Sequence, residues 1–316
     1  MENIIGLINK GKFSSFNSVI QVFSCNPYLA RFFSKGKIEI AKNKFIDSFS
    51  LVIRELHAGS FSFVPKTLTE TAMERLNLDT SQEQNPIVLL EKILFELHQH
   101  LSKYENHEIK NTSSTHYKLA KKEFDIVTKC KTSIISKLFL AQSIVKVRCC
   151  NCLNQTTIYP CYLKINCNLG TNETVNINTS LKSRFTIDYT NKACQICEPD
   201  LESSIDESII DENIFVLPDM LIVNFDRFNH QNIKNKAKLT NYSEIDLGDY
   251  IYSNSDESSR YSIQSIICSS GESCEDSKYY TLTFDNLNVF KFDNDKVSHS
   301  PKINPDEFII LIYKKI

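Results

Sequence analysis

The segment GLINKGKFSSFNSVIQVFSCNPYLARFF, residues 6–33, decides how the N-terminal part of this chain folds. From Asn17 to about Phe33 its apolar residues recur every three or four positions, which is the period of a helix. A loop that leads into a helix in this way can present a nucleophile at the helix N-terminus. Ser14 stands at that point, so the segment raises the question of whether the chain is an enzyme, a serine version of one, or an inactive copy.

The remaining pattern divides the chain into a helical part and a sheet part. Helices are expected over 45–57 and 85–101, where Asn85 is a candidate N-cap and Pro86 occupies the first turn. After Lys129 the sequence changes to apolar and β-branched runs typical of strands, over 133–149, 156–169, 183–189, 213–228, 262–270, 278–284, 289–295 and 307–315. Polar stretches at 198–212, 252–261 and 269–278 are expected to be solvated loops.

Composition bounds the partners and the compartment. The 316 residues are 41% apolar, enough for a sizeable core, and the formal charge is −2, from 36 basic and 38 acidic residues. No bulk electrostatic attraction therefore favours nucleic acid or an anionic membrane, and we expect neither as a direct partner. Neither a secretory signal nor a membrane-spanning run is found, so an intracellular protein, nuclear or cytoplasmic, is expected, with its 11 cysteines as thiols rather than disulfides.

Two C-x-x-C pairs carry the clearest chemical signal. Cys149 and Cys152 form one pair, and Cys194 and Cys197 form the other. Two thiolates on a tight turn both reach one Zn²⁺, and two such turns complete a tetrahedron that leaves no open position for substrate. The pairs predict a structural zinc site. Four ordinary reduced thiols, or a redox pair, remain the alternatives.

Four segments, taken in order with these pairs between them, resemble sequence boxes of one family. GLINKGKFSSFNSVIQ (6–21) is similar to Gly-Leu-x-Asn-x-Gly leading to Thr-Cys-(Phe/Tyr)-x-Asn-Ser, and EQNPIVLLEKILFELHQHL (83–101) to a box that begins Gln-Gln-Asp-Ala. VLPDMLIVNFDRF (216–228) resembles Leu-Pro, an apolar strand and Lys/Arg-Arg-Phe. KYYTLTF and VFKFDNDKVS (278–298) resemble Gly-His-Tyr-Thr and Trp-Tyr-Lys-Phe-Asp-Asp. The chain thus resembles the ubiquitin-specific protease family of cysteine deubiquitinases over nearly its whole length.

The resemblance implies an α+β, papain-like ubiquitin-specific protease fold in a single domain over 1–316. Residues 1–125 would form a helical thumb, 130–213 mainly zinc-binding β fingers, and 214–316 mainly a β palm. The ubiquitin tail would enter between thumb and palm. The stretch around the first cysteine pair and NPYLARFFS (26–34) look most like the histone-directed deubiquitinase subunit of a transcriptional coactivator complex.

The resemblance also locates the catalytic positions, and the chain departs from the family there. The nucleophile falls on Ser14, the base on Tyr279, the orienting residue on Asp293 and the oxyanion-hole residue on Asn9, and the Gly before the base becomes Lys278. A serine hydroxyl needs a nearby base more than a thiol does, whereas a phenol with a pKa of about 10 is protonated at neutral pH. Ser14 and Tyr279 are therefore not an activated pair.

Other residues offer weaker substitutes. Cys25 lies three helical turns after Ser14, roughly 16 Å away, and Cys274 lies in a polar loop. His299 is the histidine nearest in sequence to the orienting position, but it follows the closing strand.

Structural roles are the alternative for several polar residues. Asn9 and Asn17 could cap the first helix, Asp293 could be a turn residue, and Gln21 or Gln84 could satisfy backbone groups.

Two functions follow. The first is a catalytically inactive homologue, a pseudoenzyme that serves as a ubiquitin-binding or scaffolding subunit, with ubiquitin, a ubiquitin-like protein or other subunits of a complex as partners. The alternative is an active ubiquitin carboxyl-terminal hydrolase with a non-standard nucleophile. Bulky residues at the tail entrance, Phe13, Lys278 and Tyr279, predict an obstructed tail route, so ubiquitin would be contacted by its globular body.

Overall fold

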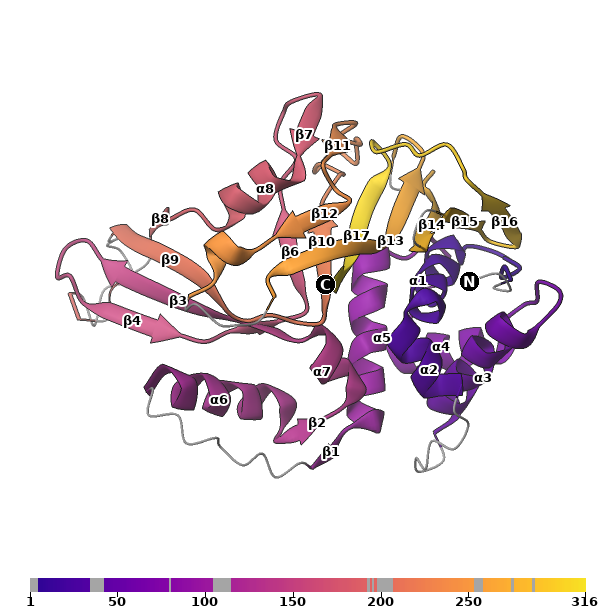
Figure 1. Cartoon of the computed structure of the whole chain (residues 1–316), viewed down its shortest axis with the longest axis horizontal. Helices are drawn as coiled ribbons and strands as arrows, with labels where there is room; N and C mark the ends of the chain where they lie inside the picture. Colours follow the sequence, from indigo (N-terminus) through magenta and orange to yellow (C-terminus); the bar gives the residue numbers. More distant parts are fainter. Residues whose placement is uncertain are drawn as a thin grey trace.

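The computed structural model describes residues 5–34, 43–79, 81–104, 115–191, 194, 196–197, 207–252, 258–273, 276–285 and 288–316. Within them, helices dominate the first third of the chain and strands the rest, which confirms the predicted α+β class. The helices are α1 (Ser14–Cys25), α2 (Pro27–Ser34), α3 (Lys44–Ala58), α4 (Lys66–Leu76), α5 (Pro86–Leu101), α6 (Thr115–Thr128), α7 (Ile134–Phe139) and α8 (Ile177–Arg184). Figure 1 shows α1 to α5 gathered beside the strands that end the chain.

An eight-stranded sheet, here the large sheet, forms the centre of the molecule. Its order is β16-β15-β14-β13-β17-β10-β6, with β12 paired to β13. Most neighbours are antiparallel, and β6 is parallel to β10. The strands are β6 (Lys164–Cys167), β10 (Met220–Phe225), β12 (Glu244–Asp246), β13 (Arg260–Ser270), β14 (Lys278–Asp285), β15 (Asn288–Asp293), β16 (Lys296–His299) and β17 (Phe308–Lys315).

Both faces of the large sheet are buried, which explains why its strands β10 and β17 are mainly apolar. Successive side chains of a strand point to opposite faces. Met220 and Ile222 of β10 accordingly pack with the helices α1 to α5, and Leu221 and Val223 pack on the other face with α8. The second face is completed by β7 (Thr174–Asn176) and β11 (Lys238–Thr240).

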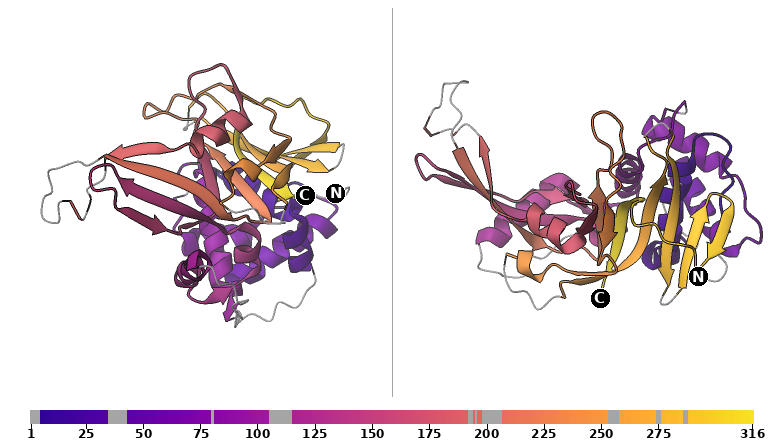
Figure 2. Two further views of the ribbon diagram at one scale, coloured as in Figure 1. Left: turned by 60° about the vertical axis from the view of Figure 1, so that its left-hand side comes forward. Right: turned by 90° about the horizontal axis from the view of Figure 1, so that it is seen from above.

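A second, five-stranded sheet, here the finger sheet, projects away from the helices (Figure 2). Its order is β4-β3-β9-β8, with β5 paired to β3. The strands are β3 (Ala141–Cys149), β4 (Gln155–Ile158), β5 (Cys161–Tyr162), β8 (Asp188–Asn191) and β9 (Glu207–Val216). Helix α6 lies against its base, where the buried Gln142 donates from Nε2 to the carbonyls of Ala120, at 2.8 Å, and Tyr159, at 3.1 Å.

Three sequence-based expectations are wrong. Residues 183–189 are expected to form a strand, but 183–184 end α8 and β8 begins at Asp188. Residues 134–139, expected within a strand, form α7, because Ser133 caps it: Ser133 Oγ accepts from the backbone N–H of Ile135 at 3.1 Å and of Ser136 at 3.2 Å. Residues 207–212, expected in a solvated loop, begin strand β9. Both long strands of the finger sheet are flanked by partners along their edges, so backbone pairing outweighs the acidic composition there.

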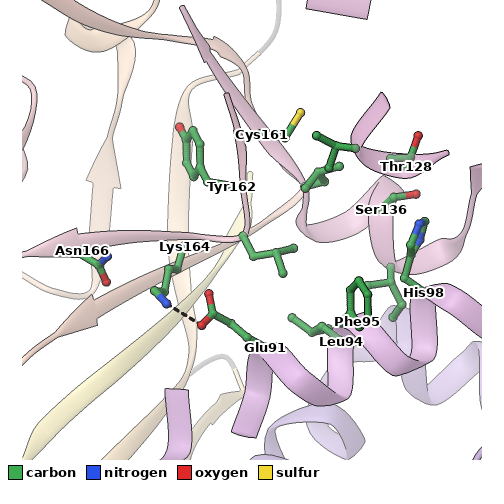
Figure 3. Close-up of a pocket in the computed structure, with 14 residues that line it drawn as sticks. Glu91, Leu94, Phe95, His98, Thr128, Ser136, Cys161, Tyr162, Lys164 and Asn166 are labelled. Atoms are coloured by element: carbon green, nitrogen blue, oxygen red, sulfur yellow. Dashed lines mark hydrogen bonds and ion pairs between the residues drawn. The ribbon is translucent and has the colours of Figure 1, made fainter. Parts of the chain in front are cut away.

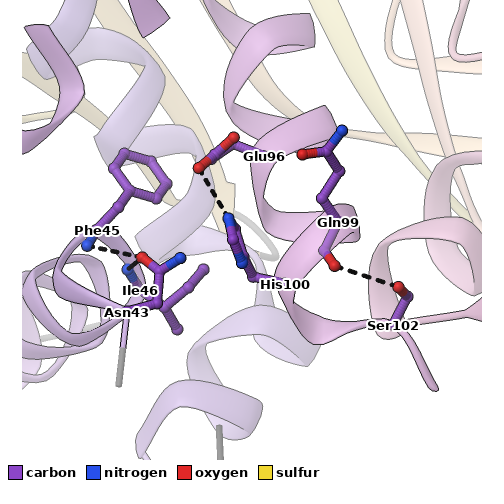
Figure 4. Close-up of polar contacts among 7 residues, drawn as sticks. All are labelled: Asn43, Phe45, Ile46, Glu96, Gln99, His100 and Ser102. Atoms are coloured by element: carbon purple, nitrogen blue, oxygen red, sulfur yellow. Dashed lines mark hydrogen bonds and ion pairs between the residues drawn. The ribbon is translucent and has the colours of Figure 1, made fainter. Parts of the chain in front are cut away.

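Other boundaries follow local rules. Asn85 caps α5 as predicted, accepting from the N–H of Ile87 at 3.1 Å, with Pro86 first in the helix. Asn43 caps α3 by accepting from the N–H of Phe45 at 2.9 Å and of Ile46 at 3.3 Å (Figure 4). The remaining short strands are β1 (Lys103–Tyr104) and β2 (Lys131–Thr132), which pair with each other.

Figure 4 also draws the last turns of α5. Glu96 Oε1 lies 3.0 Å from His100 Nε2, and Ser102 Oγ donates to the carbonyl of Gln99 at 3.4 Å. Among the helices described, none combines the length and the apolar content needed to cross a bilayer.

Candidate functional site

Helix α1 is buried along its whole length, between the other helices and the large sheet. Several of its buried polar side chains have hydrogen-bond partners, as buried polar groups require. Asn17 Nδ2 donates to the carbonyl of Leu7 at 3.2 Å and to Asn294 Oδ1 at 3.0 Å, and Gln21 Nε2 donates to the carbonyl of Ile5 at 2.9 Å. Asn17 lies inside the helix, so its interpretation as a cap is wrong, whereas Gln21 does satisfy a backbone group.

Ser14, at the predicted nucleophile position, is the first residue of α1 and is only 2% exposed. Its hydroxyl donates to Glu83 Oε1 at 2.9 Å and accepts from the backbone N–H of Tyr279 at 3.0 Å. The hydroxyl thus joins three segments that are far apart in sequence: the start of α1, the residues before α5, and β14. In this arrangement Ser14 acts as a structural bridge.

The side chain of Glu83 accepts hydrogen bonds from the first residues of α1. The helix N-cap is Phe13, which provides no side-chain acceptor. Glu83 Oε1 accepts from the backbone N–H of Ser14 at 2.9 Å, and Oε2 accepts from the N–H and the hydroxyl of Ser15, each at 3.1 Å. A carboxylate is the preferred group at a helix N-terminus, because the N–H groups there lack intrahelical partners and carry a partial positive charge.

Tyr279, at the predicted base position, lies in β14 opposite α1 and is 6% exposed. Its ring belongs to the apolar cluster that the helices share with the large sheet. The contact that it makes with Ser14 comes from its backbone N–H, which donates and takes no proton from the hydroxyl. Lys278, which precedes it, is exposed.

Asp293, at the orienting position, ends β15 and faces solvent. Its side chain is 45% exposed and its Oδ2 lies 3.5 Å from Lys291 Nζ. The neighbouring Asn294, with a positive φ of 56°, turns the chain into β16, and Asp293 pairs with Lys296 across that turn. These contacts are those of a turn residue.

The loop before α1 is hydrogen-bonded to the turn between β15 and β16. The backbone N–H of Leu7 donates to the carbonyl of Asn294 at 2.9 Å. A Cβ on Gly6 would lie 2.5 Å from that carbonyl oxygen, so the close approach requires glycine here. Asn9, at the oxyanion position, has a buried Oδ1 without a hydrogen-bond partner among the described residues.

The substitute nucleophiles are not assembled into a site. Cys25 is 5% exposed, and burial raises the pKa of its thiol to about 11, so it is protonated at neutral pH. The ring of His299 packs edge-on against that of Phe290 on the β15–β16 hairpin, with centroids 4.8 Å apart. Cys274 lies outside the described residues.

The four cysteines of the C-x-x-C pairs do come together, at the end of the finger sheet. Cys149 Sγ lies 3.7 Å from Cys197 Sγ, Cys152 Sγ lies 3.6 Å from Cys194 Sγ, and all four sulfur atoms lie within 4.8 Å of one another. Four thiolates around a tetrahedral ion with bonds of about 2.3 Å stand about 3.8 Å apart. The arrangement therefore fits a closed four-sulfur metal site.

The backbone supports this cluster. The N–H of Cys149 donates to the carbonyl of Asn154 at 3.0 Å, and Leu153, with φ 61°, closes the first turn. Backbone N–H groups of Cys197 and Ile196 lower the pKa of Cys194 to about 7, whereas the neighbouring thiols, Cys152 first, raise the pKa of Cys197. Sulfur atoms this close ionise one after another unless a cation offsets their charge.

A cavity of about 450 Å³ lies elsewhere, between α5, α7 and the strands β5 and β6 (Figure 3). It is mainly apolar, and Lys164 Nζ of β6 forms an ion pair with Glu91 Oε2 of α5, at 2.6 Å, on one side of it. Desolvation, with a smaller effect of Lys131, lowers the pKa of its His98, which is hydrogen-bonded to Ser133 Oγ at 2.8 Å. None of the residues at the catalytic positions lines this cavity.

The sequence analysis did not single out two residues that contact α1 near the predicted catalytic positions, Glu83 and Asn294. Glu83 stands 69 positions from Ser14, and no local pattern connects them. One difference in the sequence could have drawn attention to Glu83. It occupies the first Gln position of the second sequence box, so this chain has a carboxylate where the box has a neutral amide.

Comparison with known proteins identifies the family. Residues 5–313 match the family described as "Ubiquitin carboxyl-terminal hydrolase". One similar structure is the SAGA DUB module Ubp8/Sgf11/Sus1/Sgf73 bound to monoubiquitin, with a TM-score of 0.75 and 17% identity, over 99% of this chain and 69% of that one. The same module bound to ubiquitin aldehyde gives 0.74 and 18%, over 99% and 70%. At this identity the structures show the shared fold. The chain belongs to the ubiquitin carboxyl-terminal hydrolase family, with the fold of its ubiquitin-specific proteases.

Proposed function

We propose that this chain is a catalytically inactive member of its family and acts as a ubiquitin-binding or scaffolding subunit of a larger complex. One observation carries the proposal: the hydroxyl at the nucleophile position is 2% exposed and is held between a carboxylate and a backbone N–H. A nucleophile must be reachable and must lie beside a group that accepts its proton.

Glu83 is the only candidate base that touches Ser14 among the contacts described, and its geometry argues against that role. Both of its oxygens already accept from backbone N–H groups of α1. Losing the nucleophile and the base of a unit that acts together costs several orders of magnitude in rate. Asp293 cannot compensate, since it faces solvent beside Lys291.

The partners are proposed from the retained architecture. The finger sheet and the large sheet remain, and the similar solved structures are a multi-subunit module bound to monoubiquitin or ubiquitin aldehyde. We propose Zn²⁺ as the ion held by Cys149, Cys152, Cys194 and Cys197, because four thiolates in a closed tetrahedron suit it. Its role would be structural, and the proposed site of action is intracellular.

The test uses ubiquitin that carries a C-terminal electrophile, together with a fluorogenic ubiquitin substrate. Wild type is expected to form no adduct and to show no turnover, while binding of ubiquitin is followed in parallel up to high micromolar concentration. Absence of binding would remove ubiquitin as a partner and leave a scaffold for other subunits.

The alternative, an active hydrolase with a non-standard nucleophile, predicts a covalent adduct from the wild-type chain. If Ser14→Ala abolished such an adduct, the chain would be a serine hydrolase. If the adduct persisted in Ser14→Ala, peptide mass spectrometry would identify another nucleophile, with Cys25 and Cys274 as the thiols to inspect. Either adduct contradicts the proposal of inactivity.

A further inference from the structure

We propose that the Glu83 carboxylate occupies the oxyanion hole, the space beside the backbone N–H of Ser14 in which a reacting carbonyl oxygen would bind. There it excludes the carbonyl or carboxylate of a ligand's C-terminal tail. The inference rests on the proposed function and deepens it, because it adds a third inactivating feature to the loss of nucleophile and base. It makes Glu83 a residue that determines which ligands the site excludes.

The geometry resembles that of a bound anion. Glu83 Oε1 accepts from the N–H and the hydroxyl of Ser14, each at 2.9 Å, and Oε2 accepts from the N–H and the hydroxyl of Ser15, each at 3.1 Å. Four donors thus converge on one carboxylate at the N-terminus of a 12-residue helix. The cap residue Phe13 supplies no acceptor, so these donors depend on Glu83.

The donors that Glu83 uses are those that catalysis requires. When a nucleophile at a helix start attacks a carbonyl, the backbone N–H of the nucleophile's own residue stabilises the negative oxygen that develops. The corresponding N–H of Ser14 already has a carboxylate oxygen at 2.9 Å. A second negative oxygen there would displace Glu83 or meet its charge at close range, and both are unfavourable.

Strand β14 also helps to hold Ser14 against Glu83. Ser14, which donates to Glu83, accepts from the N–H of Tyr279 in β14, so the same network spans the helical part and the large sheet. Ser14 and Ser15 are 2% and 0% exposed. Introducing a cysteine at position 14 and a histidine at position 279 would therefore leave the Glu83 carboxylate in the oxyanion hole.

The experiment compares two reconstructed chains. One carries Ser14→Cys and Tyr279→His, and the other carries Glu83→Gln in addition. The probe is ubiquitin with a C-terminal vinyl sulfone, and the rate of adduct formation is measured by gel and mass spectrometry. We expect the triple variant to react at least tenfold faster than the double variant. Equal rates of reaction would overturn the proposal.

A second measurement needs no ubiquitin binding. Ser14→Cys and Ser14→Cys/Glu83→Gln are alkylated with iodoacetamide across a pH series, and the peptide that contains position 14 is quantified. With the carboxylate gone, we expect labelling of the introduced thiol to shift to lower pH by about one unit, because a nearby negative charge disfavours a thiolate. Identical profiles, or no labelling in either chain, would overturn the proposal.

The matched control replaces Glu83→Gln by Glu74→Gln, which removes the same charge from an exposed position on α4 and should change neither readout. Thermal unfolding verifies that each variant is folded. The outcome is separable from the proposed function, because inactivity is decided by the wild-type chain and the role of Glu83 by the reconstructed pair.

Discussion

The catalytic positions and the cysteine cluster were both located from the sequence, yet they differ in what they retain. The four cysteine sulfurs stand 3.6–3.7 Å apart in pairs, close to the spacing that a tetrahedral ion requires. The Ser14 hydroxyl instead bridges Glu83 and Tyr279, and Asp293 faces solvent. The four cysteines keep an arrangement that could hold a metal ion, whereas the residues at the predicted catalytic positions make hydrogen bonds and ion pairs typical of structural residues.

If the chain is inactive, as we propose, the difference indicates which part of the family architecture it still depends on. A closed metal site contributes folding energy whether or not the protein turns over substrate. Catalytic groups contribute none, and they often cost stability. A chain that keeps the fold for binding or assembly therefore keeps the first set and is free to replace the second.

The largest effect is expected at the cluster. Cys152→Ser should abolish metal binding and lower the free energy of unfolding by about 4 kcal/mol or more, because the binding energy of a structural zinc, about 10–16 kcal/mol in small fingers, is folding energy. Metal content by mass spectrometry and urea unfolding measure it.

The control is Cys150→Ser, at the exposed neighbour of Cys149, which should change neither metal content nor stability. Equal losses from both substitutions would contradict the assignment of Cys149, Cys152, Cys194 and Cys197 as the ligands.

A smaller effect is expected at the nucleophile position. Ser14→Ala should lower the free energy of unfolding by about 2 kcal/mol, because it leaves the N–H of the buried Tyr279 without its acceptor. Urea unfolding measures it, with Ser34→Ala as control: that serine is exposed, and its hydroxyl donates to the carbonyl of Ala30 in the same helix. An unchanged or higher stability of Ser14→Ala would indicate a strained catalytic residue and would break the comparison.

The smallest effect is expected at Asp293. Asp293→Ala should change the free energy of unfolding by no more than about 0.5 kcal/mol, because its ion pair with Lys291 is exposed and long at 3.5 Å. Ubiquitin binding, if present, should be unchanged. A loss above about 1.5 kcal/mol would show that Asp293 has a structural role that its contacts do not explain.

The sequence predicted the features that depend on local pattern. The helix after Asn85, the strands of the large sheet other than β12 and β16, and the pairing of the cysteine turns follow from periodicity, capping and spacing. Residues 134–139 could not be assigned by periodicity, since a short apolar run fits a strand and a helix alike. There the cap at Ser133 decided the outcome.

The hydrogen bonds around the start of α1 were harder to predict, because the residues that form them are distant in sequence. The departure from the family pattern at Ser14 and Tyr279 could be recognised in the sequence, but the hydrogen-bond network around Ser14 could not. Glu83 reaches Ser14 across 69 positions, and Asn294 reaches Asn17 across 277. Only the packing of helices on the sheet brings these groups together, and no pattern in the sequence specifies a hydrogen bond across it.

Helix α1 also makes contacts with strands that are synthesised much later than the helix itself. Its contacts with β14 join residues 265 positions apart, as between Ser14 and Tyr279. Contacts of such separation form slowly, because a long loop must close before they reward the chain. During synthesis the apolar residues of α1, Phe16 and Phe23 among them, lack the large sheet until its strands β13 and β14 have emerged. The other helices can pack on α1 early, but its sheet-facing side stays uncovered until then, and exposed apolar surface of this kind favours aggregation during folding.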